Sequence, residues 1–162
     1  MMSKNLVLMR DVICKYHPRF RKSKDIRRFG MECPEHFNVE RLIEESLAAV
    51  GGYEFVDEEG YDFSDFSDSK TTTINYTTGV GTVMGVECKI GSLRIVCYNP
   101  QKNATDYFFV RKDRVAGVKS ACYGKNSHKE RIVFKYSSKY HDHYNWFERY
   151  RVKSFKELAL AS

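Results

Sequence analysis

Three aspartates and a lysine lie in one short segment of the chain, Asp62-Phe63-Ser64-Asp65-Phe66-Ser67-Asp68-Ser69-Lys70, directly ahead of a threonine-rich run. In an extended chain, residues two positions apart point to the same face, so Asp68 and Lys70 are expected to project together. A tight turn after Asp62 would bring Asp62 back beside them. Oxygen ligands of this kind suit Mg²⁺ or Mn²⁺, and a metal held this way can activate a water and stabilise a phosphate under attack.

The order of these residues resembles the PD-(D/E)XK nuclease superfamily, in which a first aspartate and a later (D/E)-x-K triplet lie on adjacent strands of one small sheet. Asp62 matches the first aspartate, Asp68-Ser69-Lys70 matches the triplet, and an amphipathic helix precedes both. The resemblance covers residues 38 to 78. It implies a restriction-endonuclease-like core in which Asp62, Asp68 and the Ser69 carbonyl bind Mg²⁺, or Mn²⁺ in its place. It also implies that Lys70 orients or deprotonates the attacking water.

Two further sets of residues bear on this site: Glu44 as an additional metal ligand, and Glu87 with Lys89 as an alternative catalytic pair. Glu44 lies on one flank of the preceding helix, where it either leans toward the acidic segment, as a helix glutamate does in some members of the superfamily, or is simply solvated. Glu87-Cys88-Lys89 also spells (D/E)-x-K, so Glu87 and Lys89 are an alternative catalytic pair, with Asp62 or Asp68 as the distant first aspartate. A charged pair in a hairpin is more often a cross-strand ion pair, which favours the earlier triplet.

Charge is strongly segregated along the chain, whose formal net charge is +6. Residues 15 to 28 hold seven Lys or Arg against one Asp, whereas residues 54 to 68 hold seven acids and no base. The basic segment interleaves aromatic residues with its cations, as phosphate-contacting segments do. It therefore predicts nucleic-acid contacts, with a solvated charged face as the alternative. The expected contact residues are Arg19, Arg21, Lys22, Lys24, Arg27 and Arg28.

A second set of polar residues follows near the C-terminus, within an aromatic and basic stretch from Lys135 to Arg151. We expect Trp146, Phe147 and Tyr150 to point inward, as the core of a terminal strand. The polar residues of the stretch would then face a nucleic-acid ligand, since Asn, Arg and Lys suit the edges of bases in the major groove. These residues are Lys139, His143, Asn145 and Arg149.

The elements that must position these residues indicate an α+β fold, with a mixed, largely antiparallel central β-sheet flanked by helices. Apolar residues at helical spacing predict a helix that begins after Asn38 and stops at Gly51-Gly52. Ser154 and Glu157 predict the capping box of a short C-terminal helix. The expected strands are Thr71 to Thr78, then Thr82 to Ile90 and Leu93 to Asn99 as a hairpin, then Asp106 to Lys112 and Arg131 to Tyr136.

The length of 162 residues and the 42% hydrophobic content predict a single domain. We divide it into a basic N-terminal arm (1–37), a helix-and-sheet core with the metal site (38–112) and a C-terminal part (113–162). No apolar run suits a membrane helix, the charged start argues against a secretory signal, and five cysteines without a C-x-x-C motif indicate reduced thiols. We therefore expect no membrane association and an intracellular protein, prokaryotic or phage-encoded.

Together these features predict a Mg²⁺-dependent endonuclease that hydrolyses double-stranded DNA, similar to restriction, phage or homing enzymes. A palindromic target would call for a homodimer, with one site on each strand. The alternative is a non-catalytic basic nucleic-acid-binding protein, such as a phage or plasmid regulator. In that case the acidic segment is only a loop with Asx-type turns.

Overall fold

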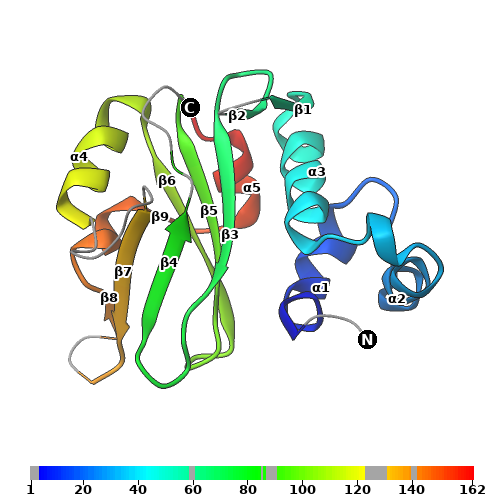
Figure 1. The fold of residues 1–162 in the computed structure, drawn as a ribbon, viewed down its shortest axis with the longest axis horizontal. Coiled ribbons are helices and arrows are strands. Elements are labelled where there is room, and N and C mark those ends of the chain that lie inside the picture. Colours follow the sequence, from blue (N-terminus) through cyan, green and yellow to red (C-terminus); the bar gives the residue numbers. More distant parts are fainter. Residues whose placement is uncertain (1–3, 59–60, 85, 87–90, 123–130, 140–141) are drawn as a thin grey trace.

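The computed structural model describes residues 4–58, 61–84, 86, 91–122, 131–139 and 142–162 (Figure 1). The helices are α1 (Lys4–Tyr16), α2 (Ser23–Glu32), α3 (Val39–Gly51), α4 (Lys112–Cys122) and α5 (Phe155–Leu160), with the 3-10 helices η1 (Pro34–His36) and η2 (Trp146–Tyr150). The strands are β1 (Phe55–Glu58), β2 (Tyr61–Phe63), β3 (Asp68–Thr73), β4 (Val80–Met84), β5 (Leu93–Asn99), β6 (Ala104–Val110), β7 (Arg131–Ser137), β8 (His143–Tyr144) and β9 (Arg151–Val152). Within these ranges, no helix combines the length and the apolar character needed to cross a membrane.

The strands form one central sheet and two smaller ones. The central sheet has the order β3-β5-β6-β9, in which β3 and β5 are parallel and the other neighbours are antiparallel. The strands β4, β7 and β8 form an antiparallel sheet of three, and β1 pairs with β2 in an antiparallel ribbon. The fold is therefore α+β, with mixed and largely antiparallel sheets flanked by helices, which confirms the predicted fold class.

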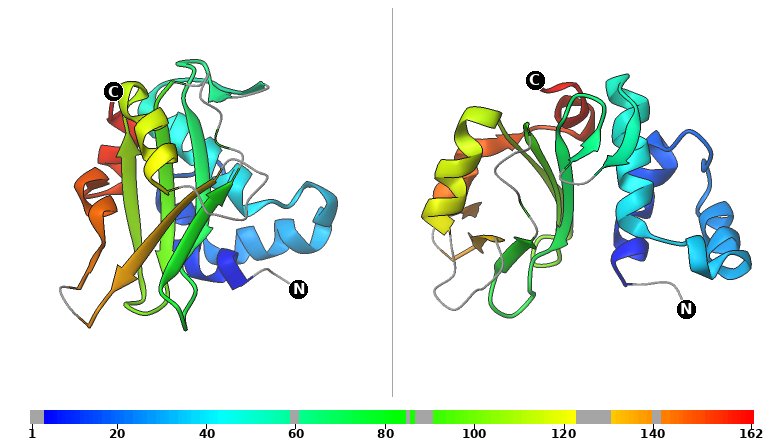
Figure 2. Two further views of the ribbon diagram at one scale, coloured as in Figure 1. Left: turned by 60° about the vertical axis from the view of Figure 1, so that its left-hand side comes forward. Right: turned by 45° about the horizontal axis from the view of Figure 1, so that its top comes forward.

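The central sheet lies between two hydrophobic cores (Figures 1 and 2). On one face, α1, α3 and α5 bury their apolar residues together with Val96 and Tyr98 of β5. On the other face, Ile95 and Cys97 of β5 pack with residues of β4, β7, β8 and α4. Successive residues of a strand point to opposite faces, and β5 is buried along its whole length, so it serves both cores.

Two helix caps that the sequence predicts are present. The Asn38 side chain accepts a hydrogen bond from the Arg41 amide at 3.3 Å, and α3 ends at Gly52, whose φ of 75° is left-handed. At the C-terminal helix, Ser154 Oγ accepts a hydrogen bond from the Glu157 amide at 3.1 Å. The Glu157 carboxylate accepts one from the amide of Lys153, one residue earlier than a regular capping box requires. Both helices therefore begin where their cap residues predict.

Several predicted strands differ in extent or in partner. The strand expected over Thr71 to Thr78 ends at Thr73, because Asn75 begins a turn in which its side chain accepts hydrogen bonds from the amides of Thr77 and Thr78. The predicted hairpin of Thr82 to Ile90 with Leu93 to Asn99 is wrong, since β4 pairs with β7 and β5 lies between β3 and β6. Alternating apolar residues indicate a strand, but they do not name its partner.

The ends of the chain also differ from the sequence-based expectation. The basic segment is not an arm, because α1 and α2 are packed helices that bury Met9, Ile13 and Ile26 in the core beneath α3. Lys112 begins α4 and does not end a strand. The stretch from Trp146 to Tyr150 is a 3-10 helix, although its aromatic residues do pack into the core as expected.

Candidate active site

A tight turn between β2 and β3 brings Asp62 back toward Asp68. The backbone amides of Asp62 and Phe63 donate hydrogen bonds to the carbonyl of Ser67 at 3.0 and 3.2 Å. The Asp62 carboxylate in turn accepts a hydrogen bond from the Ser69 amide at 2.9 Å. The two aspartates that the sequence separates by five residues therefore lie side by side, as the predicted turn requires.

Arg94 of β5 holds this turn in place through hydrogen bonds and an ion pair, a role that the sequence analysis missed. Its guanidinium donates hydrogen bonds to Ser67 Oγ and to the carbonyls of Leu158 (3.1 Å) and Ala161 (2.7 Å), and it pairs with Asp65 at 3.4 Å. Arg94 is 1% exposed, so these contacts are shielded from solvent. An arginine inside the apolar run Leu93-Arg94-Ile95-Val96-Cys97 was the available signal. Asp65, the remaining aspartate of the segment, thus stabilises the turn.

Lys70 lies next to Asp68 on β3, with its Nζ 3.2 Å from the carboxylate, as two-residue spacing on a strand predicts. Asp68 is 5% exposed. Burial and contact with the Asp62 carboxyl raise the pKa of Asp68 to about 7, although Lys70 acts in the opposite direction. One ammonium group therefore does not compensate the two adjacent aspartates.

Glu44 of α3 faces the same cluster. Burial raises the pKa of Glu44 to about 9, and the nearby carboxylates of Asp62, Glu40, Asp68 and Asp57 add to the shift. Glu44 is thus half-buried at the wall of the pocket formed by the acidic segment, which favours the first of the two alternatives. Its role in binding a metal remains a prediction.

These residues surround a pocket of about 280 Å³, which we call the acidic pocket. Glu44, Asp57, Asp62, Ser69 and Lys70 line it. The carboxylate of Asp68 lies behind this lining, in contact with Lys70 and Asp62. The acidic pocket is partly open to solvent.

The donor set fits a hard divalent cation. Mg²⁺ is usually held by one or two carboxylates and retains several waters, so Asp62 and Glu44 at the pocket wall offer suitable ligands. Ser69 Oγ is buried without a hydrogen-bond partner in the described structure, which marks it as a polar group in need of a partner. Among the residues described, no three His, Cys, Asp or Glu side chains are grouped closely enough to hold a metal ion by themselves.

The arrangement departs from the superfamily pattern in one respect. Asp62 lies on β2, which pairs with β1 and not with β3, so the two aspartates are not on adjacent strands of one sheet. The turn, and not strand pairing, brings them together. The alternative pair, Glu87 and Lys89, lies outside the described residues.

The predicted nucleic-acid contacts fall on two separate parts of the molecule. In the first set, Arg19, Arg21 and Lys22 lie in the loop between α1 and α2, and the other members lie on α2, all of them exposed. The second set lies on β7, β8 and η2 or between them, at the opposite end of the long axis (Figure 1). The two sets therefore do not form one surface.

Two residues of the second set have structural roles. Asn145 caps η2 by accepting a hydrogen bond from the Phe147 amide at 3.4 Å. The Arg149 side chain donates a hydrogen bond to the Trp146 carbonyl at 2.9 Å and lies over the Trp146 ring. Lys139 and His143 are also engaged in contacts of their own. The first set is thus the better candidate for contacting a polyanion.

A comparison of the chain with protein-family models gives no match, and a comparison with curated proteins gives none either. The acidic pocket and the charges around it are therefore the basis for the function proposed below.

Proposed function

We propose that this protein is a Mg²⁺-dependent nuclease that hydrolyses phosphodiester bonds in DNA, with a site of the PD-(D/E)XK type. The supporting observation is that Glu44, Asp62 and Lys70 line one pocket, with Asp68 in contact with both Asp62 and Lys70. An excess of carboxylates over cations at a solvent-accessible pocket is costly unless a cation binds there.

Each residue has a distinct role in the proposed reaction. The Asp62 and Glu44 carboxylates would hold the cation, with the Ser69 carbonyl as a further ligand. Asp68 orients Lys70, which either contacts the scissile phosphate and positions the attacking water as an ammonium group, or accepts the proton of that water as a neutral amine. Bound Mg²⁺ or Mn²⁺ supplies Lewis-acid stabilisation of the charge that builds up on the phosphate.

The basic residues around α2 would bring the substrate to this pocket. Arg19, Lys24, Arg27 and Arg28 are exposed, and α2 packs next to α1 and α3. Each phosphate contact releases counterions, so binding should weaken steeply as salt rises. We take an intracellular homodimer on duplex DNA as the working form, consistent with the free thiols at Cys14, Cys33 and Cys97.

Cleavage of supercoiled plasmid in Mg²⁺ and in EDTA tests the proposal. We expect nicking or linearisation only with Mg²⁺ or Mn²⁺, and a loss of at least about 1000-fold in rate for Asp68→Ala and Lys70→Ala. Both variants should still bind DNA in a gel-shift assay. Glu54→Gln is the matched control, because Glu54 is an exposed acid of the same segment and should cut at the rate of the parent protein.

The result also separates the nuclease from the alternative. DNA binding without metal-dependent cutting of any DNA or RNA substrate would leave a non-catalytic nucleic-acid-binding protein. Equal cutting by the parent protein and by Asp68→Ala would rule out the proposed site.

A further inference from the structure

A second and larger pocket, of about 430 Å³, lies next to the acidic pocket and shares the residues Asn38 and Arg41 with it. We call it the Arg19 pocket. The side chain of Arg41 forms the partition between the two. Its Nε pairs with Glu45 of the Arg19 pocket at 3.2 Å, and its Nη1 lies 3.9 Å from Asp57 of the acidic pocket. The two pockets are therefore direct neighbours, with Arg41 between them.

The guanidinium group of Arg19 packs against two aromatic rings. The Arg19 guanidinium lies 4.6 Å from the centre of the Phe20 ring and 4.9 Å from that of Phe29. Among the described residues, no carboxylate lies within ion-pair distance of it. The backbone around it is also held in place, because the buried His17 ring accepts a hydrogen bond from the Arg19 amide at 3.1 Å. Arg19 thus presents a flat, positioned cation with unused donors.

The rest of the lining of the Arg19 pocket includes both apolar and acidic side chains, and this combination restricts which ligands fit it. Phe29 and Leu42 supply apolar surface, whereas Glu35 and Glu45 supply carboxylates. A bare phosphate would meet both the arginines and these acids. A nucleobase suits the set better, because its faces stack on aromatic rings and guanidinium planes and its amino groups donate to carboxylates. The volume is also that of a small-molecule pocket and exceeds what one phosphate needs.

We propose that the Arg19 pocket binds one unpaired nucleotide, the neighbour of the nucleotide whose phosphodiester lies in the acidic pocket. The base stacks against Arg19 and Phe29, and its exocyclic amino group faces Glu45. This inference rests on the proposed nuclease function and gives its substrate class, namely DNA with an unpaired or extruded nucleotide at the cleavage position. A fully paired duplex binds more weakly, since a base must be unstacked before it can enter the pocket.

Fluorescence anisotropy in EDTA measures this preference without cleavage. The probes are a labelled DNA duplex and the same duplex with one unpaired adenosine, each titrated with the full-length protein. We expect the parent protein to bind the bulged duplex about tenfold more tightly than the paired one. Arg19→Ala should reduce this ratio to less than about twofold. Arg28→Ala is the matched control, because Arg28 is an exposed arginine of α2 that does not line the pocket, so it should weaken both complexes equally and keep the ratio.

A second readout reports on the base itself. With 2-aminopurine as the unpaired base, binding of the parent protein should change its emission, and Arg19→Ala should abolish most of that change. An equal affinity of the parent protein for both duplexes, or an unchanged ratio in Arg19→Ala, would overturn the inference even if metal-dependent cutting is observed. Conversely, a bulge preference that depends on Arg19 in a protein that never cuts would overturn the nuclease proposal alone.

Discussion

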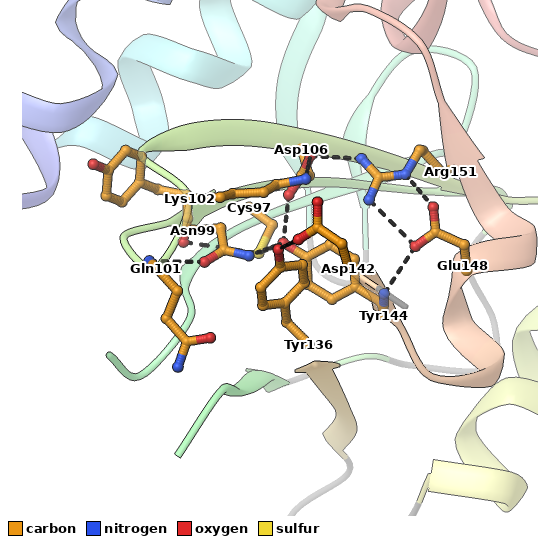
Figure 3. A network of polar contacts seen from close by, with 11 residues as sticks. Cys97, Asn99, Gln101, Lys102, Asp106, Tyr136, Asp142, Tyr144, Glu148 and Arg151 are labelled. Atoms are coloured by element: carbon orange, nitrogen blue, oxygen red, sulfur yellow. Dashed lines mark hydrogen bonds and ion pairs between the residues drawn. The ribbon is translucent and has the colours of Figure 1, made fainter. Parts of the chain in front are cut away.

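Asp68 and Asp106 are both buried aspartates, and each lies on a strand next to β5, yet their surroundings differ in one respect. Asp106 of β6 contacts Arg151 (2.5 Å), Lys102 (2.9 Å) and the hydroxyl of Tyr144 (2.5 Å). Figure 3 shows these groups converging on its carboxylate. Asp68 has one lysine and shares its surroundings with a second aspartate. The first carboxylate is fully compensated within the protein, and the second is not.

The number of cations around each aspartate distinguishes a structural carboxylate, Asp106, from a candidate ligand-binding one, Asp68. Around Asp106, the negative charge of Glu148 is balanced as well, because Arg151 bonds both acids. The network ties Tyr144 of β8 and Glu148 of η2 to Asp106 and Arg151 of the central sheet. At the acidic pocket, by contrast, the carboxylates outnumber the cations, and the proposed Mg²⁺ would supply the missing positive charge. Buried charges are tolerated in proteins when they are paired, so the unpaired set is the one that indicates function.

The largest expected effect comes from neutralising each aspartate in turn. Asp106→Asn should lower the free energy of unfolding by about 3 to 5 kcal/mol, because it leaves Arg151 and Lys102 without their buried counter-charge. Asp68→Asn should leave it unchanged within about 0.5 kcal/mol or raise it, since Asp62 remains to pair with Lys70 and one source of repulsion is removed. Urea unfolding in EDTA measures both.

The activity of the same two variants should show the reverse pattern. Asp106→Asn should cut DNA normally per folded molecule, and Asp68→Asn should not cut. If Asp106→Asn does not fold, Lys102→Met removes one of the two cations and should cost about 1 to 2 kcal/mol. Equal destabilisation by Asp68→Asn and Asp106→Asn would show that both carboxylates are structural.

A smaller effect is expected at Glu44, whose raised pKa of about 9 has a defined pH signature. A carboxyl group with a raised pKa in the folded state costs stability as pH rises from its unfolded value toward 9. Glu44→Gln should therefore stabilise the metal-free protein by about 1 to 2 kcal/mol at pH 8 and have little effect below pH 4. Thermal unfolding across this pH range in EDTA checks the trend.

Mg²⁺ should reverse the order of stability of the parent protein and Glu44→Gln. Mg²⁺ that binds only the folded state stabilises the parent protein by about 2.7 kcal/mol at a hundredfold excess over its dissociation constant. Glu44→Gln should gain much less. If the variant is less stable than the parent protein in EDTA at pH 8, or gains equally from Mg²⁺, then Glu44 is not a ligand.

Local sequence patterns predicted the parts of the site that depend on local geometry. Asp68 and Lys70 project together because they are two residues apart on a strand, and Asp62 returns to them through a turn rich in Asp and Ser. The helix that carries Glu44 follows from its apolar spacing and its Asn38 cap. In each case the information lies within a few residues of the chain.

The features that were missed depend on contacts between distant segments. The parallel pairing of β3 with β5 skips β4, and nothing in the pattern of either strand states that. Arg94 meets the turn at Ser67 and the carbonyl of Leu158, which are 27 and 64 residues away. In α1 and α2, the density of charge concealed the few apolar residues, such as Ile13 and Ile26, that hold these helices in the core.

The smallest predicted effect is at Glu45, the neighbour of Glu44. The contribution of Glu45 to the free energy of unfolding should change with pH in the opposite direction to that of Glu44. A hydrogen bond from the buried His17 ring, at 2.7 Å, lowers the pKa of Glu45, with Arg41 also contributing. A carboxylate with a lowered pKa contributes stability above its unfolded pKa and loses it as pH falls through the folded value. The parent protein should therefore lose about 1 kcal/mol of Glu45-dependent stability below pH 4.5, a modest amount because this side chain is one-third exposed.

Glu45→Gln should be less stable than the parent protein at pH 7 by that amount, and the difference should vanish in acid. Glu44→Gln should show the mirror image, with its gain growing as pH rises. The two variants differ by one position on the same helix, so helix propensity and overall charge are matched between them. Parallel pH slopes for the two would mean that α3 does not separate a glutamate surrounded by carboxylates, Glu44, from one bonded by His17 and Arg41, Glu45.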